Sequence, residues 1–205
     1  MSSKEDGIMI VLSSPSGAGK TTICKKLLTK KKSIQLSISY TTRTKRNKET
    51  HGEDYYFIKY EDFQKLKRKK YFIETAKVFD NFYGSPYENI QKAFKNNKHI
   101  LFDIDWQGAK KLRNKFPKSQ IIDFFILPPS KIELKRRLIK RGRDNEKEIN
   151  KRLSLVISEI KHYKEYEYVL INDKIIKTVN NLKKIIDCHF LLDKFKYQIK
   201  NYKIY

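Results

Sequence analysis

A run near the amino terminus has the composition and order of a phosphate-binding loop. It reads Ser14-Pro15-Ser16-Gly17-Ala18-Gly19-Lys20-Thr21 and follows an apolar stretch at residues 8–12. Backbone N–H groups of such a loop point inward around phosphate oxygens, and the helix that follows adds its positive end. In this pattern Lys20 lies along the β- and γ-phosphates, and the Thr21 hydroxyl is a ligand of Mg²⁺. We therefore expect the run to hold a chain of phosphates.

The run departs from the usual pattern at its first position, where Ser14 stands in place of a glycine. A serine there must find a permitted backbone conformation or accept modest strain. Gly17 and Gly19, at the turns where a positive φ is most expected, are both present. The alternative interpretation is an ordinary Gly/Ser turn between a strand and a helix. The apolar stretch before the run and the helix-compatible segment after it favour the phosphate-binding loop.

An aspartate ends a second apolar run, at residues 99–103. Ligand-facing residues of open α/β sheets collect at the carboxyl ends of their strands, and Asp103 has that position. It could bind Mg²⁺ through a water molecule or orient the reacting groups. The alternative is an ordinary aspartate at the end of a strand.

The apolar runs and helix-compatible segments around these residues predict a wound parallel sheet flanked by helices. Buried strands are expected at 8–12, 99–103, 121–127 and 168–171. Helices are expected at 20–30, from Ser130 into a break at 141–145, at 146–163 and at 178–194. Ser130 and Glu133 have the spacing of a capping box at the start of the second of these helices.

The segment between the first helix and residue 99 has a different character. Short strand candidates at 37–44, 55–58 and 71–74 surround a helix candidate at 60–69. This pattern predicts an inserted, largely antiparallel subdomain.

Composition limits the class of protein without deciding it. The 205 residues carry 46 lysines and arginines against 23 acidic residues, a net charge of +23. Such an excess could bind nucleic acid or steer a small phosphate-rich ligand, and it is spread along the chain. No stretch is apolar enough to cross a bilayer and no secretory segment is visible, so we expect a cytoplasmic protein without a membrane partner. We expect Cys24 and Cys188 to be reduced and buried, because they lack metal-ligand spacing.

Six further motifs lie in a fixed order along the chain. They are Ser39-Tyr40-Thr41-Thr42-Arg43 with Arg46 close behind it, Gly52-Glu53-Asp54-Tyr55, Phe72-Ile73-Glu74, Tyr83-Gly84-Ser85, Asp103-Ile104-Asp105-Trp106-Gln107-Gly108 and Ile149-Asn150-Lys151-Arg152-Leu153. With the phosphate-binding loop they make the chain resemble guanylate kinase, the nucleoside monophosphate kinase that phosphorylates GMP from ATP. The resemblance covers residues 8–186.

The resemblance implies an α/β fold with a P-loop kinase core. In a single domain over residues 1–205, the core would comprise 8–36, 97–135 and 164–200. A mixed, largely antiparallel GMP-binding subdomain would occupy 37–96, and a helical lid 136–163. The reaction implied is Mg²⁺-dependent transfer of the γ-phosphoryl group of ATP to GMP, and to dGMP, giving ADP and GDP.

Guanine presents two adjacent donors, N1–H and the 2-amino group, beside the O6 acceptor. A carboxylate accepts two such donors at once, and Glu74 is the residue we expect to do so. The resemblance implies that Asp105 assists at the 2-amino group, while Ser39 and Ser85 face O6 and neighbouring edge atoms. Adenine would leave these carboxylates facing a lone pair, so the site should discriminate strongly. Taken alone, Glu74 could equally be a surface carboxylate at a strand end.

The phosphate of GMP needs cations and donors instead. Arg43 and Arg46 offer forked guanidinium groups, and Tyr55 and Tyr83 add phenolic hydroxyls. Taken alone, the two arginines could equally form a solvated basic loop.

Phosphoryl transfer needs charge neutralisation more than acid or base chemistry. The resemblance makes Arg137, Arg141 and Arg152 lid residues that approach the transferring group, beside Lys20 and Arg43. It also places Asn172 near the adenine base, and it extends the ATP-binding run of residues 14–21 to Thr22. A lone arginine in so basic a chain could instead belong to a solvated helix.

Two other classes of function fit parts of this pattern. Guanylate-kinase-like domains of scaffolding proteins bind phosphopeptides in the nucleotide monophosphate site, but they usually lack an intact phosphate-binding loop. A nucleic-acid binder is suggested by charge alone, and no RNA- or DNA-binding motif accompanies it. We therefore expect ATP and GMP as partners and no nucleic acid.

Overall fold

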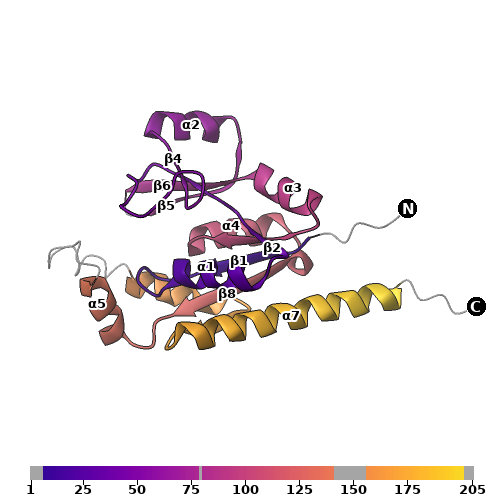
Figure 1. Ribbon diagram of the computed structural model, residues 1–205. Helices are drawn as coiled ribbons and strands as arrows, with labels where there is room; N and C mark the ends of the chain where they lie inside the picture. Colours follow the sequence, from indigo (N-terminus) through magenta and orange to yellow (C-terminus); the bar gives the residue numbers. More distant parts are fainter. Residues whose placement is uncertain (1–6, 79, 141–155, 201–205) are drawn as a thin grey trace, which may run out of the picture.

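Five parallel strands form a sheet in the order β2-β7-β1-β8-β9 in the computed structural model, which describes residues 7–78, 80–140 and 156–200 (Figure 1). The strands are β1 (Met9–Ser13), β2 (Ile34–Leu36), β7 (His99–Asp103), β8 (Ile121–Leu127) and β9 (Tyr168–Ile171). The order places β1, which leads into the phosphate-binding loop, between β7 and β8 at the centre of the sheet. The predicted parallel sheet is confirmed.

Both faces of this sheet are covered by helices. Side chains alternate along β1, so that Ile10 and Leu12 face α1 (Lys20–Lys30) and α7 (Ile175–Lys200), whereas Met9 and Val11 face α3 (Tyr87–Lys95) and α4 (Trp106–Lys115). Burial on both sides explains why the central strands are continuous apolar runs rather than alternating ones. The carboxyl ends of β1 and β7 are left to form a site.

A second, four-stranded sheet in the order β4-β3-β6-β5 lies above the first in Figure 1. Its strands are β3 (Tyr40–Thr41), β4 (Tyr56–Phe57), β5 (Phe72–Val78) and β6 (Asn81–Pro86). β3 pairs in parallel with β4 and antiparallel with β6, and β5 pairs antiparallel with β6. The helix α2 (Tyr60–Arg68) covers this sheet, with Phe63 stacked on Phe72. The inserted mixed subdomain expected from the sequence is therefore present.

Most of the remaining elements come before or after residues 141–155 along the chain, a segment outside the described residues. α5 (Lys131–Lys140) follows β8, residues 156–160 are helical, and short 3₁₀ helices occupy Lys118–Gln120 and Lys161–Glu165. Ser130 Oγ accepts a hydrogen bond from the Glu133 N–H at 3.1 Å, as the capping box predicts. Most of the helix expected at 146–163 lies outside the described residues.

Several expectations are wrong in detail. The strand expected over 37–44 is limited to Tyr40–Thr41. β6, α3 and α4 were not predicted from the sequence. Cys24 is buried as expected, but Cys188 is exposed, since it lies on the outer side of α7; both are free thiols. Among the described residues no helix is long and apolar enough to span a membrane.

Candidate active site

The phosphate-binding loop connects the end of β1 to the first turn of α1. Gly17 and Gly19 have φ values of 92° and 96°, the left-handed region in which glycine is favoured. The φ of Ser14 is not positive, so the serine in place of the usual glycine imposes no left-handed backbone. The Ala18 N–H closes the turn on the Pro15 carbonyl at 3.2 Å. The loop therefore has the backbone that the sequence predicts.

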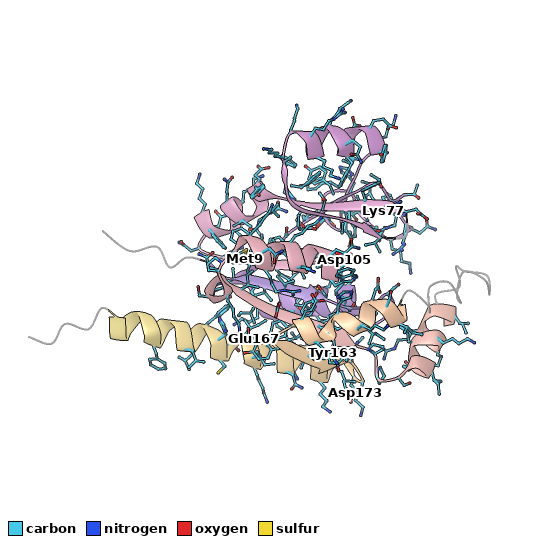
Figure 2. All side chains as sticks on the ribbon, turned by 180° about the vertical axis from the view of Figure 1, so that it is seen from behind. Met9, Lys77, Asp105, Tyr163, Glu167 and Asp173 are labelled. Carbon is cyan, nitrogen blue, oxygen red and sulfur yellow. The ribbon has the colours of Figure 1, made fainter. Side chains whose placement is uncertain are left out.

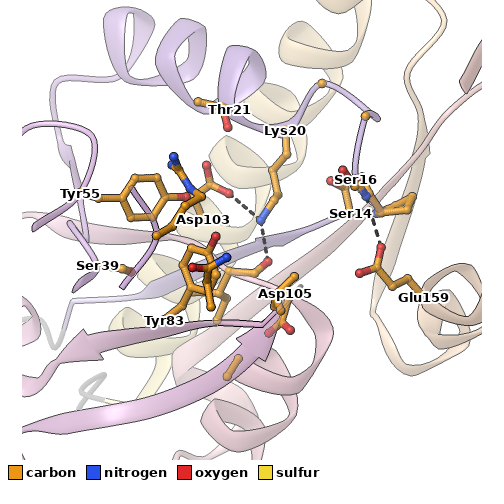
Figure 3. Close-up of a pocket in the computed structure, with 18 of the residues that line it drawn as sticks. Ser14, Ser16, Lys20, Thr21, Ser39, Tyr55, Tyr83, Asp103, Asp105 and Glu159 are labelled. Atoms are coloured by element: carbon orange, nitrogen blue, oxygen red, sulfur yellow. Dashed lines mark hydrogen bonds and ion pairs between the residues drawn. The ribbon is translucent and has the colours of Figure 1, made fainter. Parts of the chain in front are cut away.

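Lys20 extends from this loop toward the end of β7 (Figure 3). Its Nζ lies 2.6 Å from Asp103 Oδ1 and donates to the Ile104 carbonyl at 2.8 Å. Burial alone would lower the pKa of Lys20, but the neighbouring Asp103 outweighs it, so the pKa is raised and the ammonium stays charged. A fixed cation thus lies at the centre of the site before any ligand enters.

Glu74 is buried on β5, and only one of its two carboxylate oxygens has a hydrogen-bond partner. Ser85 Oγ donates to Glu74 Oε1 at 2.7 Å, and Ser39 Oγ lies 3.0 Å from Ser85 Oγ. Glu74 Oε2 is buried without a hydrogen-bond partner. Burial, together with the nearby Asp105, raises the pKa of Glu74 to about 7. A buried acceptor oxygen without a partner is costly, and a ligand with a suitable donor would satisfy it.

Asp105 begins α4 and has two partners within its own turn. Its Oδ1 accepts from the Gly108 N–H at 2.9 Å, and its Oδ2 accepts from Gln107 Nε2 at 3.1 Å. Burial raises its pKa. As an N-cap, the carboxylate is fixed by the helix and still faces the cavity.

Arg43 and Arg46 are organised by Glu49, which the sequence analysis missed. The Arg43 guanidinium makes a two-pronged contact with Glu49 at 2.9 and 3.0 Å, and the Arg46 N–H donates to the same carboxylate at 2.9 Å. Arg43 also lies over the Tyr55 ring, 5.5 Å from its centroid. The basic loop is thus ordered around an acidic residue and is not simply solvated.

One cavity of about 340 Å³ is lined both by the phosphate-binding loop and by the group of residues around Glu74, Arg43 and Asp105 (Figure 3). These are the two halves of the site. It is lined by loop residues Ser14, Pro15, Ser16, Gly17, Gly19, Lys20, Thr21 and Thr22, by Ser39, Arg43, Arg46, Tyr55, Glu74, Tyr83, Asp103 and Asp105, and by the further residues Ala76, Val78, Asn81, Ile104 and Glu159. Phosphate-binding backbone therefore opens into the same space as a partly unsatisfied buried carboxylate and two arginines.

Comparison with known protein families identifies the class of protein. A family profile described as guanylate kinase matches residues 7–189. The chain belongs to the guanylate kinase family. Guanylate kinase of Buchnera aphidicola subsp. Schizaphis graminum is 44% identical over 182 residues, 88% of this chain and 87% of that protein. Guanylate kinase of Caldanaerobacter subterraneus subsp. tengcongensis is 44% identical over 186 residues, 91% of this chain and 89% of that protein.

A solved structure agrees with the sequence comparison. The crystal structure of guanylate kinase from Anaplasma phagocytophilum matches with a TM-score of 0.75 and 36% sequence identity, covering 90% of this chain and 87% of that chain. The family catalyses the phosphorylation of GMP, and its fold is that of P-loop kinases. The resemblance drawn from the six motifs is confirmed, and the chain is a nucleoside monophosphate kinase.

Of the described residues expected in this guanylate kinase site, Ala18, Ser85, Arg137 and Asn172 do not line the cavity. Ala18 is buried within the loop, and Ser85 lies behind Glu74, to which it donates. Arg137 bonds to Glu133 at 2.8 Å and to the Asn172 carbonyl at 3.2 Å. Arg141 and Arg152 lie outside the described residues.

Asn172, expected near the adenine base, lies against the phosphate-binding loop. Its side chain is fully buried, donates to the Ala18 carbonyl at 2.7 Å and accepts from Thr178 Oγ1 at 3.0 Å. A Cβ on Gly19 would come within 2.7 Å of its amide nitrogen. The amide therefore supports the phosphate-binding loop from the side away from the cavity.

Glu159 is a second acidic residue at the guanylate kinase site that sequence reasoning missed. Its Oε2 accepts from the Ser16 N–H at 3.2 Å, and burial raises its pKa. The neighbouring segment is held by His162, whose ring stacks on Trp106 with centroids 3.6 Å apart. A carboxylate on the loop N–H shows that the loop attracts anions. Nothing in the spacing of Glu159 along the chain signals this contact, which joins residues far apart in sequence.

Proposed function

We propose that this cavity transfers the γ-phosphoryl group of ATP to GMP, and to dGMP, in a Mg²⁺-dependent reaction that gives ADP and GDP. The observation that carries the proposal is the single cavity that holds Lys20 of the phosphate-binding loop and the unpaired Glu74 Oε2. The first group suits the phosphates of a donor, and the second suits a base that presents N–H donors. Two nucleotides bound end to end would place phosphates beside Lys20 and a base beside Glu74.

GMP binding is assigned to residues 37–96 together with the start of α4. Glu74 accepts from guanine N1–H and the 2-amino group, with help from Asp105, while Ser39 and Ser85 orient the carboxylate and face the O6 edge. The GMP phosphate binds Arg43 and Arg46, with the hydroxyls of Tyr55 and Tyr83 beside them. Their presence in the lining supports this assignment, Ser85 excepted.

Arg43 and Arg46 meet the GMP phosphate only if the phosphate replaces or joins Glu49 at the guanidinium groups. The pairing keeps the Arg43 guanidinium in a defined position before GMP binds. Preorganised cations lose less side-chain entropy on binding a phosphate than free ones do.

ATP binding is assigned to residues 14–22, with Asn172 supporting the loop from below. The donor set fits Mg²⁺, because the Thr21 hydroxyl and the Asp103 carboxylate are oxygen ligands that line the same cavity. No cluster of three His, Cys, Asp or Glu side chains able to hold a metal occurs among the described residues. Oxygen ligands shared with substrate phosphates suit Mg²⁺ better than a dedicated protein cage does. Bound there, Mg²⁺ neutralises charge on the phosphate oxygens.

Transfer depends on positioned positive charge. Lys20 lies where the β- and γ-phosphates would bind and would exchange Asp103 for phosphate oxygens. Arg137 lies on α5 and would contribute from the lid assigned to 136–163. The same role is proposed for Arg141 and Arg152, outside the described residues. Closure over both nucleotides would keep water from acting as the acceptor.

The test is a coupled assay of ADP formation with purified protein, Mg²⁺ and ATP. ADP should form when GMP is added, and AMP, UMP or CMP should not replace GMP. ADP formation independent of GMP, or equal rates with AMP, would contradict the proposal. A protein that binds phosphopeptides but forms no ADP would instead be a recognition module; the intact loop with its charged Lys20 argues against that outcome.

A further inference from the structure

Side chains of α4 bond to backbone carbonyls of β5 in a regular series. The pairs are Gln107 with Lys77, Lys111 with Thr75, and Lys115 with Ile73. In each pair the side-chain nitrogen donates to the carbonyl oxygen, at 3.2 Å for Gln107. We call the three donors, Gln107, Lys111 and Lys115, the α4 ladder. In Figure 2 Lys77 lies above Asp105, with β5 over the start of α4.

The spacing of the ladder follows from the geometry of the two elements. Residues four apart on a helix are separated by about 6 Å along its axis. Residues two apart on a strand are separated by about 6.6 Å. The two repeats therefore stay in register over the three pairs. β5 is an edge strand of its sheet, so every second carbonyl faces away from β6 and is free to accept from α4.

The ladder connects the two carboxylates that face the guanine position. Glu74 lies on β5 between two of the carbonyls that the ladder holds, and Asp105 caps the same helix that carries the ladder. The contact is close, because a Cβ on Gly108 would come within 2.7 Å of Glu74 Oε2. A shift of β5 along α4 would therefore move Glu74 relative to Asp105.

Lys111 also acts on Glu74 electrostatically. Burial and the negative charge of Asp105 raise the pKa of Glu74, while Ser85 of β6 and the ammonium of Lys111 oppose the rise. The remaining charged groups that line the cavity are Lys20, Arg43, Arg46, Asp103 and Glu159. Lys111 is the one α4 cation among the main influences on the Glu74 carboxylate.

We propose that Lys111, supported by Gln107 and Lys115, is a positioning residue for guanine recognition, which holds β5 on α4 so that Glu74 and Asp105 keep the separation that the base requires. This inference rests on the proposed function for the assignment of the base. It adds residues that touch no nucleotide to the determinants of base selectivity.

The experiment compares Lys111→Met with Lys111→Arg and with Lys110→Met. Methionine keeps the aliphatic stem and removes both the donor and the charge, whereas arginine keeps both. Lys110 is also exposed on α4 and its replacement removes the same charge, but it is not part of the ladder. We expect Lys111→Met to raise KM for GMP about tenfold, as weakening of a charge-assisted hydrogen bond does. KM for ATP and kcat should change less than twofold, and Lys111→Arg should restore most of the GMP affinity.

Two further readouts separate positioning from stability. IMP lacks the 2-amino group of GMP. The ratio of kcat/KM for GMP to kcat/KM for IMP should fall in Lys111→Met, because Glu74 and Asp105 would no longer be spaced to bind the N1–H and 2-amino groups together. The titration of Glu74, followed by carboxyl-carbon NMR and assigned by its loss in Glu74→Gln, should move to higher pH in Lys111→Met and not in Lys110→Met. This titration needs no nucleotide.

Each outcome supports or contradicts the positioning role of Lys111. An unmoved Glu74 titration, or equal effects of Lys111→Met and Lys110→Met on KM for GMP, overturns the positioning role. Equal rises in KM for ATP and GMP, with a lower melting temperature, also overturn it, since they indicate general loss of structure. A Glu74 titration that moves in a protein without GMP-dependent activity supports the ladder and contradicts the proposed function instead.

Discussion

The Glu74 carboxylate is 3% exposed, and its burial raises its pKa to about 7. Near neutral pH the group is therefore divided between its neutral and ionised forms. Guanine presents two donors, N1–H and the 2-amino group, and the ionised carboxylate offers acceptor oxygens for both, whereas the neutral acid carries a proton on one oxygen, so GMP should select the ionised form. The same residue thus links substrate binding to pH and, through its burial, to the stability of the fold.

The pH dependence of GMP affinity follows from this link. Below pH 7 we expect KM for GMP to rise about tenfold for each unit of pH, since one unit removes nine-tenths of the remaining carboxylate. KM for ATP should change much less over the same range. Steady-state kinetics between pH 5.5 and about pH 8.5 measure both, and parallel profiles for the two substrates would contradict the assignment of Glu74.

Replacement of Glu74 by glutamine should have opposite effects on binding and stability. KM for GMP should rise about 100-fold, because the amide has one acceptor oxygen and turns a donor toward the second guanine N–H group. The pKa of Glu74 is higher in the folded state than its usual value of 4.5, so its ionisation costs folding free energy as pH rises from about 4.5 through 7. At pH 8 the variant should be more stable than the wild type by up to about 3 kcal/mol. Urea unfolding at pH 5 and pH 8 tests this, and a difference independent of pH would contradict it.

Lys20 should affect turnover far more than GMP binding. We expect Lys20→Met to lower kcat about 100- to 1,000-fold, the loss typical of a cation or donor aimed at developing transition-state charge. The dissociation constant for GMP, measured by calorimetry without ATP, should stay within about threefold, because Glu74 and Arg43 lie in the other half of the cavity. An equal loss of GMP affinity would show that the two halves of the site are not divided in this way.

At the scale of elements, the phosphate-binding loop is supported by the turn that joins β9 to α7. Asn172 begins this turn, and its side chain connects the Ala18 carbonyl to the Thr178 hydroxyl. Asn172→Ala would leave a buried carbonyl without its donor. We expect a loss of about 2–3 kcal/mol in the free energy of unfolding and a higher KM for ATP.

The matched control is Asn181→Ala, an exposed asparagine on α7. Its replacement should change the free energy of unfolding by less than about 0.5 kcal/mol. Equal effects of the two substitutions in urea unfolding would show that Asn172 does not support the loop.

Sequence patterns predicted the central elements better than the peripheral ones. Strands at His99–Asp103 and Ile121–Leu127 and the helix at Lys20–Lys30 have the expected bounds, because burial on both faces or a defined loop marks their ends. α4 was missed, since few of its residues are apolar and three of its polar side chains form the ladder. β6 was missed because Gly84 and Pro86 interrupt its pattern.

Motifs that sit at the ends of strands predicted most of the candidate site. Lys20, Asp103 and Asp105 follow apolar runs or begin helices, so their positions could be inferred from the parallel sheet. Glu49, Glu159 and the role of Asn172 could not. They depend on contacts between segments that are distant in the chain or within a loop, and a carboxylate or amide at such a position has no periodic signal.

At the scale of the whole molecule, a parallel sheet and a mixed sheet meet around one cavity, with α4 packed against both (Figure 1). The cavity therefore takes its phosphate-binding groups from one sheet and its base-binding carboxylate from the other. The basic runs at residues 30–32 and 65–70 are largely exposed. Lys31 is an exception, since it is half-buried, pairs with Asp187 and lies over the Phe190 ring.

The net charge of +23 should make the fold sensitive to ionic strength. Like charges spread over one small surface repel each other in the compact state, and salt screens the repulsion. Because the screening length falls from about 30 Å at 0.01 M salt to about 8 Å at 0.15 M, the free energy of unfolding should rise by about 1 kcal/mol over that range. Urea titrations in sodium chloride measure the change. The triple variant Lys67→Gln, Lys69→Gln and Lys95→Gln removes three exposed charges and should be more stable than the wild type at low salt, with a smaller rise on adding salt. A stability that falls as salt is added would instead mean that the ion pairs of this surface outweigh its repulsion.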